Sequence, residues 1–283
     1  MTAITARIPQ VDWTQGFERR WNGGDPAVTH AFNTLSLLFP QAEKFFIEVA
    51  REVSTQIGLP ADSKLGNEVK LFIAQEAIHT TQHNQYNETL KSQGFDNVIH
   101  DFVERLQARA HRYLSPLTKL AAVCAYEHYT AILGNFILTH PQALEPAPAD
   151  MALIWGWHAA EETEHKAVCF DLYHAAGGRW LRRSLVFMQV TLDFSFMFGR
   201  LYFSLLRRDG CLKPAQLGRT TGQFIRFFFG ASGVAWHLLG HGLTYFSPWF
   251  HPWNQTNRDE LNAWLSANQP RLRSLGHNDC VNN

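Results

Sequence analysis

The chain has 283 residues, enough for one large domain with a sizeable hydrophobic core. Hydrophobic residues make up 46% and charged residues 18%, so the chain either buries much of its surface or rests against something apolar. The 25 basic and 25 acidic residues cancel, and no basic stripe indicates a nucleic-acid partner.

The cysteines and the N-terminal residues indicate the compartment. The four cysteines are scattered and form no CxxC pair, which argues against a zinc ribbon or a disulfide framework: Cys124, Cys169, Cys211 and Cys280. The opening MTAITARIPQVDW lacks the basic-then-apolar pattern of a signal peptide. We therefore expect a cytoplasmic protein with reduced thiols.

Composition shifts divide the chain into three parts. Residues 1–30 hold Pro9, a Gly-Gly pair and Pro26, and we expect an extended arm that packs loosely over the body. Residues 31–178 are predicted to form a four-helix bundle, and residues 179–283 an apolar helical region packed on it, within one overall domain.

Helix signals follow one another through the bundle. The predicted helices cover residues 31–56, with Pro40 at the first position of a helix inside this range, then 63–92 after a cap at Asp62 or Ser63, about 96–110, 115–139, and 150–177 after a cap at Asp150. No strand-like alternation stands out, so the predicted fold class is all-α.

One stretch, WHAAEETEHKAVCFDLY, carries the main chemical pattern. On a helix, His158, Glu162 and His165 stand at i, i+4 and i+7 and share one side of two turns. Glu76 and His79 repeat the Glu-x-x-His element in the upstream segment IAQEAIHTTQHNQYN. Two such elements on different helices are typical of ferritin-like bundles that bind two iron or manganese ions.

That type of site needs one further carboxylate from each of two other helices. Glu43 shares its helix face with Phe46 and Ile47, whereas Glu48 lies on the solvated side. Glu127 is the only acidic residue in an otherwise apolar helix, and a carboxylate buried alone costs several kcal/mol. The predicted metal ligands are Glu43, Glu76, His79, Glu127, His158, Glu162 and His165.

Two histidines remain open to a second interpretation. His158 is either a seventh ligand or a histidine that hydrogen-bonds a ligand carboxylate, and His83 has the same ambiguity in the other helix pair. Glu161 and Glu164 are predicted to lie off the metal face, although Glu161 also stands i, i+4 to His165. We interpret His128 as a core or surface histidine.

Residues 180–245 are rich in apolar and aromatic side chains. Asp193 and Arg200 interrupt the first part, which argues against a membrane-spanning helix. Our first hypothesis is that these helices cover the bundle and wall an apolar substrate pocket. The alternatives are a peripheral membrane contact or a homodimer face. His237 and His241 have no carboxylate companion and are interpreted as structural.

The motifs FPQAEKFF, FIAQEAIHTTQH, AYEHYTA and WHAAEETEHKAVCFDLY resemble a bacterial family labelled predicted metal-dependent hydrolases, over most of the chain. The same motifs look like ferritin-like di-iron proteins, such as ribonucleotide reductase small subunits and bacterial multicomponent monooxygenases. The arrangement of His158, Glu162 and His165 is closer to the di-iron arylamine N-oxygenases.

The resemblance to N-oxygenases implies a division of ligands between two irons. Glu43, Glu76, His79 and a shared Glu162 would serve one iron, and Glu127, His158 and His165 the other, with Glu76 and Glu162 bridging. This resemblance is confined to the ligand helices and implies no particular substrate.

From the residues and the resemblance we predict an enzyme in which two Fe(II) ions activate O2. It would oxidise a hydrophobic or amine-bearing small molecule, with electrons from a partner reductase. The second hypothesis is a two-metal hydrolase using Zn2+ or Mn2+, and the third is a non-enzymatic bundle in which metal only holds the fold.

Overall fold

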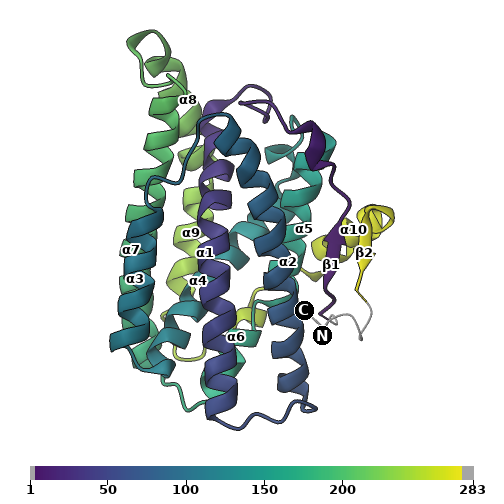
Figure 1. The fold of residues 1–283 in the computed structure, drawn as a ribbon, viewed down its shortest axis with the longest axis vertical. Coiled ribbons are helices and arrows are strands. Elements are labelled where there is room, and N and C mark those ends of the chain that lie inside the picture. The colour runs from purple at the N-terminus through teal and green to yellow at the C-terminus, as the bar shows by residue number, and fades with distance from the viewer. Residues whose placement is uncertain (1–3, 276–283) are drawn as a thin grey trace.

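Four long helices form the centre of the molecule in the computed structural model, which describes residues 4–275 (Figure 1). They are α1 (Pro26–Gln56), α2 (Lys64–Ser92), α4 (Pro116–Thr139) and α5 (Ala149–His165). The remaining α-helices are α3 (His100–Tyr113), α6 (Val168–Ala175), α7 (Trp180–Arg208), α8 (Pro214–Phe229), α9 (Val234–Thr244) and α10 (Arg258–Asn268). The all-α prediction is confirmed, with one small sheet added. The part of the predicted C-terminal region beyond residue 275, including Cys280, lies outside the described residues.

Side-chain caps set several helix starts. Ser63 and Ser115 accept hydrogen bonds from backbone N–H groups of α2 and α4, as their position in the sequence predicts. Asp25 does the same for α1, so this helix begins at Pro26 and not at Ala31. Asp150 is not a cap: it lies in the first turn of α5, where Arg271 donates to its carboxylate.

Pro40 does not start a helix, as predicted, but lies inside the continuous helix α1. A proline within a helix provides no N–H and pushes away the carbonyls of the preceding turn. In α1, asparagine side chains take up two of these carbonyls. Asn87 Nδ2 donates to Ser36 O at 2.8 Å, and Asn97 Nδ2 donates to Leu37 O at 2.8 Å. These bonds replace helix hydrogen bonds and also tie α1 to α2 and to the segment before α3.

The last bundle helix is interrupted where one continuous helix to residue 177 was predicted. α5 ends at His165, and α6 begins at Val168 after a turn. Lys166 in this turn donates its ammonium to Gln255 O at 2.7 Å and to Asn257 Oδ1 at 3.1 Å. The chain therefore changes direction directly after a predicted metal ligand.

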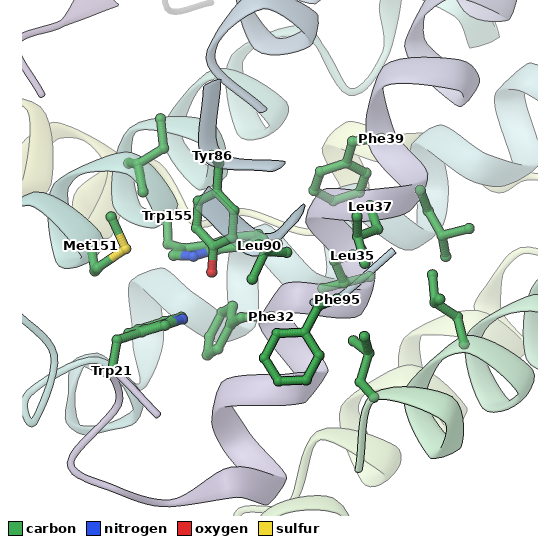
Figure 2. Packing of buried hydrophobic residues seen from close by; sticks show 14 of the residues in the cluster. Trp21, Phe32, Leu35, Leu37, Phe39, Tyr86, Leu90, Phe95, Met151 and Trp155 are labelled. Atoms are coloured by element: carbon green, nitrogen blue, oxygen red, sulfur yellow. The ribbon is translucent and has the colours of Figure 1, made fainter. Parts of the chain in front are cut away.

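The N-terminal arm is not loosely packed, which corrects the prediction. Ala6 and Trp21 are buried, and β1 (Arg7–Pro9) pairs antiparallel with β2 (Leu272–Ser274). Trp21 belongs to the large apolar cluster in Figure 2, with Phe32 from α1, Tyr86 from α2 and Trp155 from α5. The arm thus contributes to the core at one end of the bundle.

A close approach of two helices brings the halves of the bundle together. α4 and α5 meet at Gly134, where a Cβ atom would lie 2.9 Å from Ala159 O and 3.3 Å from Ala159 Cα. Only glycine fits this separation without moving a backbone. Outside the four helices, α7 packs on α1 and α4, and α9 packs on α4. Within residues 4–275, the structure contains no helix that combines the length and apolar character needed to cross a bilayer.

Candidate metal centre

The seven predicted ligands come together in the interior, between the four long helices. α1 contributes Glu43, α2 contributes Glu76 and His79, α4 contributes Glu127, and α5 contributes His158, Glu162 and His165. All seven side chains are buried. Four carboxylates and three imidazoles are therefore removed from water and gathered in one place.

Two groups of possible ligands share Glu76. Ligand atoms of Glu43, Glu76 and His79 lie within 4.8 Å of one another, and so do those of Glu76, Glu127 and His165. Glu76 therefore belongs to both groups of possible ligands.

Glu162 occupies a second central position. Its Oε1 lies 3.0 Å from His158 Nε2 and 3.7 Å from His79 Nδ1, while its Oε2 lies 3.3 Å from His165 Nε2. The Thr130 hydroxyl donates to the same Oε2 and holds the carboxylate in this orientation. Glu162 therefore reaches histidines from both parts of the cluster.

The hydrogen-bond pattern fits a bound cation. Among the described residues, neither carboxylate oxygen of Glu76 or of Glu127 has a hydrogen bond, and Glu43 Oε1 and His79 Nδ1 also lack one. Buried polar atoms are nearly always satisfied, and an unpaired buried carboxylate is costly. The orphaned atoms are the donor types that iron, manganese and zinc accept.

Burial also shifts the acid–base equilibria of the cluster. It raises the pKa of Glu43 and of Glu76 well above the ordinary value, and that of Glu127 to about 7. Burial opposes ionisation of Glu162 too, yet the charge of His165 and a hydrogen bond from His158 hold its pKa well below the ordinary value. Without a cation, the protein carries more carboxylate in this space than it can keep ionised.

Two of the histidines are hydrogen-bonded through the ring nitrogen that faces away from the cluster. His79 Nε2 is hydrogen-bonded to Glu161 Oε2 at 3.1 Å, which leaves Nδ1 directed at the cluster. His165 Nδ1 is hydrogen-bonded to Gln75 Oε1 at 3.0 Å, which leaves Nε2 beside the carboxylates. A partner on the far ring nitrogen is the usual way in which a ligating histidine is oriented.

Arg7 connects these two supports. Its guanidinium lies 2.8 Å from Glu164 Oε1 and 3.5 Å from Glu161 Oε1, and its backbone N–H donates to Glu161. Glu164 in turn accepts from Gln75 Nε2 at 3.1 Å. Glu161 and Glu164 therefore lie off the metal face, as predicted. No local pattern in the sequence predicted the roles of Arg7 and Gln75. The run of acidic residues in an otherwise apolar helix was the one sign that such partners were needed.

His83 has both ring nitrogens engaged, although it also falls within ligand range of Glu43 and His158. Its Nδ1 is 2.9 Å from the Ser36 hydroxyl and its Nε2 is 2.9 Å from His158 Nδ1. This geometry suits a histidine that orients His158. His158 itself stacks on His79, with ring centroids 4.2 Å apart, whereas the resemblance groups it with Glu127 and His165.

Residues 5–256 match the protein family described as predicted metal-dependent hydrolase. The chain belongs to this family. No curated protein and no solved structure matches the chain. The family description indicates a metal-dependent enzyme, and the buried cluster provides residues that could hold the metal. Neither identifies the metal.

An apolar cavity of about 270 Å³ borders the cluster. Glu43 and Glu162 line it from the metal side, and the rest of the wall comes mainly from apolar side chains of α1, α3, α4 and α7. The described part of the lining contains no lysine, arginine or histidine. A ligand in this cavity would meet mostly hydrocarbon, with Glu43 and Glu162 on the metal side and Asp193 of α7 as a further carboxylate in the wall.

The hypothesis that residues 180–245 wall an apolar pocket agrees with this geometry. A second cavity, of about 710 Å³, lies between α1, α4, α7, α8 and α9. The two cavities adjoin, because Leu35, Tyr129, Leu133 and Phe194 line both. His128 is a core histidine with its Nε2 3.1 Å from His241 O.

Proposed function

We propose that this protein is a dinuclear iron enzyme that uses O2 to oxidise a hydrophobic organic molecule. The observation that carries the proposal is the set of buried carboxylate oxygens without hydrogen bonds, on Glu76 and Glu127 above all, next to an apolar cavity. A cation-binding cluster beside a hydrocarbon-lined space suits chemistry on C–H or N–H bonds of an apolar substrate.

The donor set favours iron over a purely structural ion. Four carboxylates and three imidazoles provide hard oxygen donors and intermediate nitrogen donors, a combination compatible with both common oxidation states of iron. Two iron ions held in this way supply electrons for the activation of O2. Because carboxylates and imidazoles are not themselves electron donors, a partner reductase would renew the reduced metals.

The side chains of this protein have definable tasks in such a reaction. Glu76 and Glu162 would help to hold the metal, because each lies close to ligand atoms in both parts of the cluster. Thr130 fixes one oxygen of Glu162 and thereby its orientation toward the cavity. The apolar wall excludes water and positions the substrate against the carboxylate end.

The test is metal analysis of protein produced with iron and zinc both available, followed by anaerobic Fe(II) loading and exposure to O2 in a spectrophotometer. We expect about two irons per chain, as in other dinuclear carboxylate bundles, and a transient visible band. Glu127→Gln should reduce the iron content and abolish the band, while the surface variant Glu48→Gln should change neither. Tight zinc or manganese without any optical response to O2 contradicts the proposal.

The family description favours a second candidate, a two-metal hydrolase. Two adjacent metals can hold a hydroxide that attacks an ester, amide or phosphate. The cavity wall argues for the oxidase, because Thr130 already donates to Glu162 and no lysine or arginine in the described lining could stabilise an oxyanion. Hydrolysis of long-chain esters by the zinc-loaded protein without O2, lost in Glu127→Gln, would instead favour the hydrolase.

A further inference from the structure

Helices α7, α8 and α9 lie on the side of the bundle away from β1, β2 and α10 (Figure 1). They leave large apolar side chains in contact with solvent. The exposed residues form stripes at helical spacing: Leu181, Leu185, Met188, Leu192, Phe196 and Phe203 on α7, Leu217, Ile225 and Phe229 on α8, and Trp236, Leu239 and Leu243 on α9. We call these residues the outer apolar face. Apolar patches of this extent on a soluble surface mark an interaction site.

The same segment is strongly basic. Residues 179–245 contain nine of the 25 basic residues and two of the 25 acidic ones, a formal charge of +7, so the rest of the chain carries −7. Eight of the nine basic side chains are exposed: Arg179, Arg182, Arg200, Arg207, Arg208, Lys213, Arg219 and Arg226. Of the two acids, Asp209 is bound by Arg19 and Arg20 of the N-terminal arm. Two of the exposed arginines pair with acids outside the segment, Arg208 with Asp96 and Arg226 with Asp25, which leaves six exposed basic side chains to attract an anionic surface.

The basic and apolar residues share one surface of α7. Arg200 follows Phe196 by four residues, and Arg207 follows Phe203 by four, so both arginines continue the apolar stripe. A helix with apolar side chains on one face and arginines on and beside that face lies in the headgroup region of an anionic bilayer, where both kinds of side chain are stabilised.

The larger cavity opens on this face. Met188 and Leu192 from α7 and Leu239 and Leu243 from α9 line the cavity and are also 46–67% exposed. The described lining contains no charged residue. The smaller cavity, which Glu43 and Glu162 line, lies on the other side of the shared wall residues Leu35, Tyr129, Leu133 and Phe194.

The positive charge of residues 179–245 indicates whether the outer apolar face binds a lipid surface or a second copy of the chain. A two-fold symmetric dimer would bring the same face of each copy together, so one +7 segment would meet another. An anionic bilayer has the opposite sign and attracts each nearby arginine or lysine by about 1 kcal/mol.

We propose that the outer apolar face docks on an anionic lipid bilayer with the cavity mouth turned into the lipid, and that a long hydrocarbon chain enters the cavity from there. The entry of a hydrocarbon chain rests on the proposed function, since it names the substrate class of the same site. The docking on a bilayer rests on the surface residues alone.

Flotation of the metal-loaded full-length protein with vesicles tests the docking. Vesicles of phosphatidylcholine and phosphatidylglycerol in equal parts should carry the protein, and vesicles of phosphatidylcholine alone should carry much less. Arg200→Glu with Arg207→Glu should weaken binding by at least about 30-fold, the loss expected from removing two basic residues before the new carboxylates add repulsion. Raised salt should weaken it further.

A matched double variant controls for charge alone. Arg51→Glu with Lys91→Glu makes the same charge change on α1 and α2, and it should leave vesicle binding close to that of the parent. Leu185→Glu, on the face but outside the cavity lining, should also weaken binding while circular dichroism and metal content stay unchanged.

Equal binding to both vesicle types, no binding to either, or equal losses in both double variants overturns the docking. If the protein does not float but forms a dimer, and Leu185→Glu dissociates that dimer, the outer apolar face binds a second copy of the chain and not a bilayer. For the cavity, cis-parinaric acid fluorescence should report binding. Leu238→Trp, which narrows the cavity from a half-buried position outside the outer apolar face, should reduce this binding without loss of flotation. Absence of binding overturns the entry of a hydrocarbon chain. A protein that floats but gives no optical response to O2 contradicts the proposed function and not the docking.

Discussion

Two buried clusters in this protein combine histidine and carboxylate within metal-ligand distance, and they differ in what neutralises the acid. Around Asp209, Arg19 Nε lies 2.5 Å from one oxygen, while Arg20 Nε and His30 Nε2 lie 2.6 and 3.1 Å from the other. In the bundle, four carboxylates face three histidines, and Glu76 and Glu127 have no hydrogen bond among the described residues.

The difference shows that distance alone does not identify a metal site. Asp209 has its counter-charges within the protein, and these lower its pKa despite burial, with His30 and the two arginines donating to it. In the bundle, Glu76, Glu127 and Glu162 share the single imidazole of His165 as counter-charge, and no lysine or arginine pairs with them among the described residues. A cation of two or more charges would offset the burial of these carboxylates. Charge balance separates the candidate metal centre from a structural ion-pair cluster.

The largest effect should come from removing one orphaned carboxylate. Glu127→Gln should weaken metal binding by more than the about 10–100-fold typical of a supporting residue. The metal-free variant should be more stable than the metal-free parent, because a buried charge without partners is gone. Metal content and urea unfolding with a chelator present measure both. Full metal occupancy in Glu127→Gln would place the ion elsewhere.

Arg7→Ala tests the supporting layer behind the centre. It leaves Glu161 and Glu164 buried without a counter-charge, which should lower the free energy of unfolding by about 3–5 kcal/mol. It should also weaken metal binding by about 10–100-fold, through the hold on His79 and His165. Arg7→Lys keeps the positive charge but cannot contact Glu161 and Glu164 with two nitrogens at once. It should therefore recover part of the stability and part of the metal affinity. Unchanged metal affinity in Arg7→Ala would show that the N-terminal arm does not support metal binding.

His128 provides a buried group outside both clusters. Burial lowers its pKa to about 4, because the ring projects from α4 against the aromatic rings of Tyr245 and Phe250. The unfolded chain binds a proton below about pH 6.5, so the folded state loses stability as the pH falls from 6.5 toward 4, by about 3 kcal/mol in total. Urea unfolding of the metal-free protein across this range should show the loss, and His128→Gln should lack this part of it. Parallel curves for the two proteins would show that His128 does not titrate there.

Asp209→Asn should have the smallest effect. It removes the charge that Arg19 and Arg20 share, but these side chains are 41% and 33% exposed, and water screens them. We expect a loss of about 2 kcal/mol in unfolding free energy, with metal content unchanged. A drop in metal content would mean that the two clusters are not independent.

Local patterns in the sequence predicted the helices and the seven converging residues, because helical spacing decides which side chains share a face. Glu43 and Glu127 were identifiable since each is an acid on an apolar face. Arg7 could not be identified, because its contact with Glu161 and Glu164 joins distant segments without any local signal. Pro40 misled the prediction of a helix start for the same reason: Asn87 and Asn97, far along the chain, compensate for it.

The pairing of β1 with β2 gives the centre an unusual dependence on chain topology. Arg7 sits opposite Ser274, so the strand that positions the guanidinium behind His79 and His165 is itself held by residues near the other end of the described chain. Contacts across such sequence separations form late in folding, because closing a long loop costs entropy first. The four helices could therefore assemble before the ligands are fully oriented. The rate of metal uptake after dilution from denaturant would then report this last closure and not the formation of the bundle.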